Sequence, residues 1–142
     1  MNKKPTILYI ITQGGPWGGA QKYVHDLSMA FADEYHVVVA VGEPNVDRAL
    51  QEKFESRITN HESRAPSVIQ LQHLKRSVST IQYILAIHEL WQLYKKIKPD
   101  IVHLNSSKAM IIGALSPITY HLSPITIATI HGWASNEPGW PS

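Results

Sequence analysis

Short apolar runs alternate with longer periodic segments along the chain. The run at residues 7–11 has no polar break, and the runs at 36–42 and 125–130 are rich in β-branched residues. Such runs favour strands that are covered on both faces, as in a parallel sheet. The run at 100–105 predicts a further strand, and the weaker run at 68–71 predicts one more.

The segments between these runs carry apolar residues at helical spacing. Four helices are predicted: over residues 20–32, from a cap at Asn45 or Asp47 to residue 55, from Ser77 or Ser79 to about residue 98, and from Ser106 to about Pro117. The apolar stripe of the third takes in Ile81, Ile84, Trp91, Tyr94 and Ile97. Pro99 ends that helix, because the residue before a proline disfavours the α region.

Strands that alternate with helices predict an α/β fold. We expect a Rossmann-like parallel sheet flanked by helices, with right-handed crossovers and the strand order 3-2-1-4-5. The 142 residues suffice for one domain, since a chain of this size buries roughly 68% of its unfolded surface. Residues 1–133 should form this domain, and residues 134–142, with two prolines and a glycine, should form an irregular tail.

Composition narrows the classes of function. A net charge of +2 gives no reason to expect nucleic acid as a partner. The absence of cysteine excludes a disulfide scaffold and a thiolate metal site, and it fits a cytoplasmic location. The histidines have no accompanying carboxylate cluster, so no metal site is predicted. The apolar run at residues 7–11 is too short for a signal peptide or a membrane span.

A glycine-rich turn between the first strand and the first helix is the leading candidate site. Gly14, Gly15, Gly18 and Gly19 leave the backbone uncovered by Cβ atoms. A helix starting at Gly19 would direct its N–H groups and positive dipole end at an anion such as a diphosphate. The spacing matches neither the dinucleotide fingerprint nor a P-loop, so a tight turn without a ligand is the alternative. Position favours a ligand, because open sheets bind ligands beyond the carboxyl ends of their strands.

Three segments resemble the N-terminal domain of the family 4 glycosyltransferases, which have the two-domain GT-B fold. They are Gly18-Gly19-Ala20-Gln21 at the opening of the first helix, Lys-Pro-Asp-Ile-Val-His-Leu-Asn-Ser-Ser-Lys at 98–108, and Thr-Ile-His-Gly-Trp at 129–133. Their order and spacing along nearly the whole chain are more specific than any one motif. The Asn-Ser-Ser-Lys and His-Gly-Trp variants resemble enzymes that build capsular or other surface polysaccharides.

The resemblance implies transfer of a sugar, with retention at the anomeric carbon. The donor would be a nucleotide sugar, as co-substrate, and the acceptor a saccharide or a lipid-linked molecule, with no tightly bound cofactor. By position in the motifs, Gly18 and Gly19 would contact the donor diphosphate, His131 would act in catalysis near the transferred sugar, and Asn105, Ser106 and Lys108 would shape the acceptor pocket.

Several residues at these motifs have a structural alternative. His103 fits a packed, hydrogen-bonded position within its strand better than a functional one. For His131, at a strand end, function is favoured. Lys108 is either an acceptor residue or a solvated helix residue. Trp17 and Trp133 are either lid residues, residues that stack on the acceptor sugar, or anchors of their loops.

Family members carry a second Rossmann-like domain, which holds the nucleotide and a pair of glutamates near the donor sugar. We therefore expect this chain to be an acceptor-side domain that is inactive alone: a fragment, a truncated product, or half of a split enzyme with a separate donor-domain chain. A non-catalytic binding or scaffold subunit and a generic nucleotide-binding Rossmann module are the alternatives. The latter is disfavoured, because Val41 and Gly42 stand where a ribose-binding acid is expected, although Glu43 follows.

Basic residues border the longest predicted helix. They are Lys75, Arg76, Lys95, Lys96 and Lys98. Contact with anionic lipids would suit a lipid-linked acceptor and a peripheral position at the inner face of a membrane. A solvated helix surface is the favoured interpretation, given the small net charge.

Overall fold

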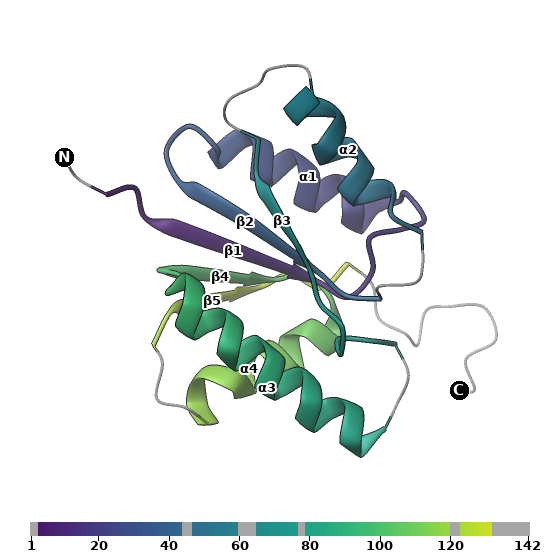
Figure 1. The fold of residues 1–142 in the computed structure, drawn as a ribbon, viewed down its shortest axis with the longest axis vertical. Coiled ribbons are helices and arrows are strands. Elements are labelled where there is room, and N and C mark those ends of the chain that lie inside the picture. Colours follow the sequence, from purple (N-terminus) through teal and green to yellow (C-terminus); the bar gives the residue numbers. More distant parts are fainter. Residues whose placement is uncertain (1–2, 44–46, 60–64, 77–78, 120–122, 132–142) are drawn as a thin grey trace.

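The computed structural model describes residues 3–43, 47–59, 65–76, 79–119 and 123–131. Parallel strands form one sheet in the order β3-β2-β1-β4-β5, with helices between them (Figure 1). The predicted fold class and strand order are confirmed. In chain order the elements are β1 (Thr6–Ile11), α1 (Gly19–Phe31), β2 (His36–Val41), α2 (Ala49–Thr59), β3 (Ser67–Gln70), α3 (Thr80–Ile97), β4 (Ile101–Leu104), α4 (Ser107–Thr119) and β5 (Ile125–Ala128).

The central strand, β1, is buried along its whole length. Ile7 pairs in register with Val37 of β2 and with Ile101 of β4. An unbroken apolar run suits this place, because successive side chains point to opposite faces and both faces are covered. The predicted burial of the first strand on both faces is confirmed.

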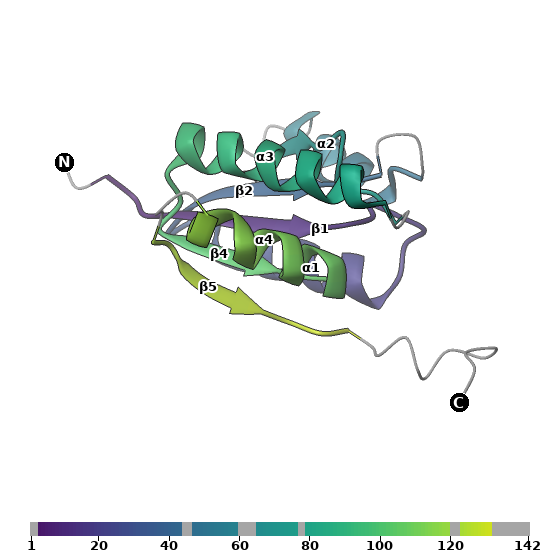
Figure 2. The same ribbon diagram turned by 90° about the horizontal axis from the view of Figure 1, so that it is seen from below.

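Two layers of helices cover the sheet. α1 and α2 lie on one face, and α3 and α4 lie side by side on the other (Figures 1 and 2). Tyr9, Val39 and Phe54 belong to the core under α1 and α2, whereas Leu8 and Leu90 belong to the core under α3 and α4. Because Leu8 and Tyr9 are neighbours in β1, one strand contributes to both cores.

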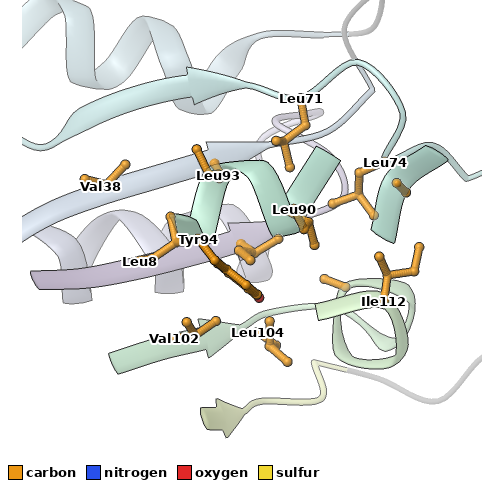
Figure 3. Packing of buried hydrophobic residues seen from close by; sticks show 14 residues of the cluster. Leu8, Val38, Leu71, Leu74, Leu90, Leu93, Tyr94, Val102, Leu104 and Ile112 are labelled. Carbon is orange, nitrogen blue, oxygen red and sulfur yellow. The ribbon is translucent and has the colours of Figure 1, made fainter. Parts of the chain in front are cut away.

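The packing beneath α3 fixes this helix on the sheet (Figure 3). Leu90, Leu93 and Tyr94 of α3 belong to the same cluster as Leu8 of β1 and Val102 of β4. Each of the five side chains is at most 9% exposed. Burial of one such side chain stabilises the fold by about 1.5–3 kcal/mol.

The apolar stripe predicted for α3 is wrong in part. Tyr94 is buried, but Ile81 and Ile84 are 69% and 63% exposed. The buried face of α3 consists of Ala86, Leu90, Leu93 and Tyr94. This helix carries apolar residues on more than one face, so helical spacing alone could not identify the buried one.

α4 continues to Thr119, past its predicted end at Pro117. A proline has no N–H to donate to the carbonyl four residues earlier, which here is that of Gly113. That carbonyl accepts a hydrogen bond from the buried Tyr94 hydroxyl of α3, at 3.1 Å. A side chain from the neighbouring helix therefore replaces the missing helical bond.

β5 is shorter than its predicted run and lies at one edge of the described sheet. All four of its residues are exposed, with Ile125 at 66% and Ile127 at 45%. The cover that parallel strands ordinarily have on both faces is missing here in the described residues. The predicted tail at 134–142 lies outside the described residues, as does Trp133.

Candidate functional site

Two of the four glycines in the turn after β1 lie close to neighbouring side chains. A Cβ atom at Gly14 would come within 2.2 Å of Gln51 Oε1, and one at Gly15 within 2.5 Å of Asp47 Cγ. The Gly14 carbonyl also accepts a hydrogen bond from Leu50 N at 2.8 Å. The first half of the turn is therefore fitted against the start of α2.

Gly18 and Gly19, in contrast, lie at the surface. Nothing approaches within 4 Å of a Cβ atom placed at Gly19. Gly18 is the N-cap of α1, which has no side-chain cap and no acidic residue in its first turn. The orphan N–H groups and positive dipole end of α1 therefore lie at an exposed surface. Packing does not require glycine at position 19, which leaves the close approach of an anion as a reason for it.

Trp17 contacts both helices that flank the turn. Its ring centroid lies 5.8 Å from that of His25 in α1, and Lys53 Nζ of α2 lies 4.6 Å from the indole centroid. The side chain is 38% exposed. These contacts favour an anchoring role for Trp17, while stacking on a sugar stays a prediction.

The start of α4 lies beside the end of β1. Ser106 Oγ lies 2.6 Å from Thr12 Oγ1, and it accepts a hydrogen bond from Ala109 N at 3.1 Å. Ser106 therefore caps α4, as a serine at this position is well suited to do. Because only Gln13 separates Thr12 from Gly14, the structure brings the glycine turn and the Ser106 segment together.

Asn105 is buried between these two segments, with 1% of its surface exposed. Its Nδ2 donates to the His103 carbonyl at 2.9 Å, and its backbone N–H donates to the Ile10 carbonyl at 2.8 Å. Its Oδ1 is buried without a hydrogen-bond partner among the described residues. A buried, unpaired amide oxygen is unfavourable, so this atom is able to accept a hydrogen bond from a ligand.

Four side chains meet at the carboxyl ends of β4 and β5. They are Tyr23 of α1, His103 of β4, and Thr129 and His131 after β5, and we call them the histidine cluster. Thr129 Oγ1 lies 2.8 Å from His103 Nε2 and 3.4 Å from Tyr23 Oη. The Tyr23 ring stands edge-on to His131, with centroids 4.9 Å apart. The packed, hydrogen-bonded position predicted for His103 is confirmed.

The histidine cluster adjoins the glycine turn through Tyr23. This residue follows Gly19 by four positions, which is about 6 Å along a helix. Tyr23 and Thr129 are not among the site residues predicted from the sequence. The sequence holds one signal for Tyr23, since a tyrosine one helical turn beyond a candidate ligand-binding loop combines an apolar ring with a polar tip.

Burial sets the protonation of the two histidines. It lowers the pKa of His103, and the nearby charge of His131 lowers that pKa further. Burial also lowers the pKa of His131, although its side chain is the more exposed of the two. Tyr9 lies beneath, 5.3 Å from His103 between ring centroids, and burial raises its pKa to about 12. Both imidazoles therefore favour the neutral form, in which one ring nitrogen accepts a hydrogen bond.

Lys108 belongs to the opposite helix layer. Its Nζ lies 4.6 Å from the ring centroid of Tyr83 on α3, whereas Tyr23 is on α1. Burial lowers the pKa of Lys108, and the carboxylate of Glu43 acts in the other direction. The structure gives Lys108 a partner in α3, and its place in an acceptor pocket stays a prediction.

Two hollows lie away from these residues. One of about 300 Å³ is lined by residues that include Lys4, His36 and Ser67, and one of about 210 Å³ lies between Tyr94 and Pro124. Neither includes a predicted site residue, and we assign them no role. Across the described ranges, no group of three or more His, Cys, Asp or Glu side chains is arranged to hold a metal ion.

A Rossmann-like parallel sheet with polar groups at its carboxyl edge is the arrangement in which α/β domains commonly bind ligands. Residues 17–142 match Glycosyltransferase Family 4, and the chain belongs to this family. No curated protein matches the chain. In the part of the chain that the structure describes, no helix has the length and apolar character needed to cross a bilayer.

Solved structures share the fold at low sequence identity. The apo form of the lipopolysaccharide outer core galactosyltransferase WaaB has a TM-score of 0.66 at 12% identity, over 89% of this chain and 33% of WaaB. Anabaena Alr3699/HepE in complex with UDP and glucose has a TM-score of 0.56 at 18% identity, over 81% of this chain and 27% of that protein. A UDP-N-acetylglucosamine 2-epimerase has a TM-score of 0.61 at 19% identity, over 87% of this chain and 33% of the epimerase. The chain therefore spans about a third of the length of these proteins, and the likeness is one of fold.

Proposed function

We propose that the chain is the acceptor-side domain of a retaining glycosyltransferase. It would help to move a sugar from a nucleotide-sugar donor, as co-substrate, to a saccharide or lipid-linked acceptor, without a tightly bound cofactor. Family membership supports sugar transfer. The epimerase neighbour has a similar fold, so the family match rather than the fold favours transfer.

The observation that carries the proposal is the bare N-terminus of α1 next to the histidine cluster. Gly18 and Gly19 would bind the donor diphosphate through backbone N–H groups, and the helix dipole would add about 0.3–1 kcal/mol. Tyr23 contacts His131 one helical turn farther along α1. A sugar attached to a diphosphate at Gly19 would therefore lie within reach of His131.

His131 would hydrogen-bond the reacting sugar or its acceptor. A neutral imidazole both donates and accepts, so it suits a hydroxyl group of either molecule. Ser106, Asn105 and Lys108 would shape the acceptor side. Support for this comes from Ser106 beside the glycine turn and from the unpaired Oδ1 of Asn105.

A donor domain would complete the site, either in the same polypeptide or as a separate chain. Holding donor and acceptor in reacting geometry can lower a barrier by about 7–11 kcal/mol, which one wall of a cleft cannot do. This chain alone would then be inactive. A binding or scaffold subunit that never takes part in transfer is the alternative.

The acceptor would be presented at the inner face of a membrane if it is lipid-linked. Lys75, Arg76, Lys95, Lys96 and Lys98 lie before α3 and at its end, and anionic lipids attract such residues by about 1 kcal/mol each. We propose peripheral contact on this basis.

The glycine turn offers a sharp test of the proposal. In a two-domain form, completed with a family 4 donor domain, Gly19→Val should raise the donor KM strongly or abolish transfer. The branched side chain would occupy the space that the diphosphate needs. The fold should be retained, because nothing lies within 4 Å of a Cβ atom at Gly19.

Transfer of labelled sugar and the melting temperature should be measured together. Ala30→Val is the matched control, since Ala30 is exposed near the opposite end of α1, and its kinetics should be unchanged. Wild-type kinetics in a folded Gly19→Val protein would exclude the diphosphate role.

A further inference from the structure

The chain segment that carries His131 gains little from apolar packing. Every residue of β5 is exposed, and so are Ile130 and His131. Among residues 125–131, only Thr129 is partly buried. The contacts of the Thr129 side chain are therefore the ones through which the rest of the fold can hold this segment.

The backbone of this segment is paired with β4 as far as Thr129. β5 pairs with β4 in register, and the Thr129 N–H donates to the Leu104 carbonyl at 2.9 Å. The described residues provide no further backbone hydrogen bond at positions 130 and 131. The position of the His131 imidazole therefore depends on contacts between side chains.

The Thr129 hydroxyl is bonded to a residue that is itself firmly held. Its Oγ1 lies 2.8 Å from His103 Nε2, and His103 is 7% exposed with the Tyr9 ring beneath it. A neutral imidazole carries its proton on one ring nitrogen, so this hydrogen bond also selects the tautomer of His103. The bond thus ties the end of β5 to the buried part of β4.

Tyr23 contacts His131 through its ring. The two ring planes are 69° apart, with centroids at 4.9 Å, which is a favoured edge-to-face arrangement. The Tyr23 hydroxyl lies 3.4 Å from Thr129 Oγ1, which is long for a hydrogen bond between two oxygens. The ring of Tyr23, and not its hydroxyl, is therefore the part that limits the imidazole of His131.

We propose that Thr129 and Tyr23 are positioning residues for His131. Thr129 fixes the backbone two residues before His131, and the Tyr23 ring restricts where the imidazole can lie. Because Tyr23 is one helical turn beyond Gly19, the ring contact holds His131 at a set distance from the N-terminus of α1. The inference rests on the role of His131 in the proposed function, and it gives this exposed histidine a defined place.

NMR spectroscopy of the full chain tests the positioning without any transfer activity. The neighbouring Tyr23 ring displaces the ring signals of His131 from those of a free histidine. Thr129→Val and Tyr23→Ala should both move these signals towards the free values. Thr129→Ser keeps the hydroxyl and Tyr23→Phe keeps the ring, so both should resemble the parent.

The ring nitrogen shifts of His103 give a second readout in the same samples. Thr129→Val should change them, because the hydrogen bond that selects the tautomer is lost, and Thr129→Ser should restore them. Thr126→Val is the matched control, since Thr126 is exposed on β5, and it should leave the signals of both histidines unchanged.

Kinetics of the two-domain form test whether the positioning matters for transfer. Thr129→Val and Tyr23→Ala should each lower kcat/KM by about 2- to 13-fold, because they can remove at most the contribution of His131. The loss should fall on the same parameter, kcat or KM, as in His131→Ala. Combined with His131→Ala, neither change should lower kcat/KM further by more than about two-fold.

The possible results distinguish this proposal from the proposed function. His131 signals that stay unchanged in Thr129→Val and Tyr23→Ala would overturn the positioning roles. Losses of kcat/KM that add fully to that of His131→Ala would overturn them as well. Signals that respond as expected, in a chain whose two-domain form transfers no sugar, would support the positioning and contradict the proposed function.

Discussion

At the scale of single residues, the two histidines of the cluster have different surroundings. His103 is 7% exposed and close to Thr129 Oγ1, with Tyr9 beneath it. His131 is exposed and touches Tyr23. One imidazole is therefore held within the sheet, and the other is able to meet a ligand.

His103 should make the fold sensitive to mild acid. Its folded pKa lies below the ordinary value of about 6.5, so the unfolded chain binds more protons as the pH falls through this region. The free energy of unfolding should then be full above about pH 7 and decline below about 6.5. Urea titrations at pH 7.5 and 5.5 measure the decline, which should be smaller in His103→Gln. Equal declines in both proteins would contradict the assignment.

His131 should matter for transfer rather than for folding. A hydrogen bond between a neutral imidazole and a hydroxyl group is worth about 0.5–1.5 kcal/mol, so His131→Ala in the two-domain form should reduce kcat/KM by about 2- to 13-fold. The melting temperature should change little, because the side chain is exposed. An unchanged kcat/KM with a clear loss of melting temperature would make His131 a packing residue.

At the scale of elements, α3 and α4 depend on one hydroxyl. The Tyr94 hydroxyl donates a hydrogen bond to the Gly113 carbonyl. Pro117 cannot donate this bond, because proline has no backbone N–H. Tyr94→Phe leaves this carbonyl unpaired and should lower the free energy of unfolding by about 1–3 kcal/mol. Chemical denaturation measures the loss. The control Tyr83→Phe removes a hydroxyl from a partly exposed ring that keeps its contact with Lys108, and it should cost far less.

Most elements could be predicted because their patterns are local. An unbroken apolar run such as that of β1 has few alternatives in a fold with alternating helices. Two features could not be predicted: the buried face of α3 and the end of α4. The buried face of α3 depends on which of several apolar faces of the helix meets the sheet. The second depends on Tyr94, a residue 23 positions before Pro117.

The candidate site likewise has a part that could be predicted from the sequence and a part that could not. Gly18, Gly19 and Ser106 lie in motifs, and the structure places their segments at one edge of the sheet. Tyr23 and Thr129 reach the histidine cluster through tertiary packing of α1 on the sheet. No spacing in the sequence connects two residues that are 106 positions apart.

At the scale of the whole molecule, this chain should bind nucleotide sugars weakly when alone. The dipole end of α1 offers about 0.3–1 kcal/mol toward an anion, whereas a Kd near 100 μM needs about 5.5 kcal/mol. Calorimetry with a panel of nucleotide sugars should detect little or no binding, and a product assay no transfer. Micromolar binding by the lone chain would show that the donor site lies elsewhere.

β5 is the strand of the sheet that is expected to open most easily. Local opening of a native structure begins where few apolar contacts hold the backbone, and every residue of this strand is exposed. Thr129 and His131 follow β5 closely in the chain. Each local opening of β5 would therefore move their side chains away from His103. Another protein surface packed over β5 would suppress this local opening. The histidine cluster would then become ordered only on assembly with that surface, and not in the isolated chain.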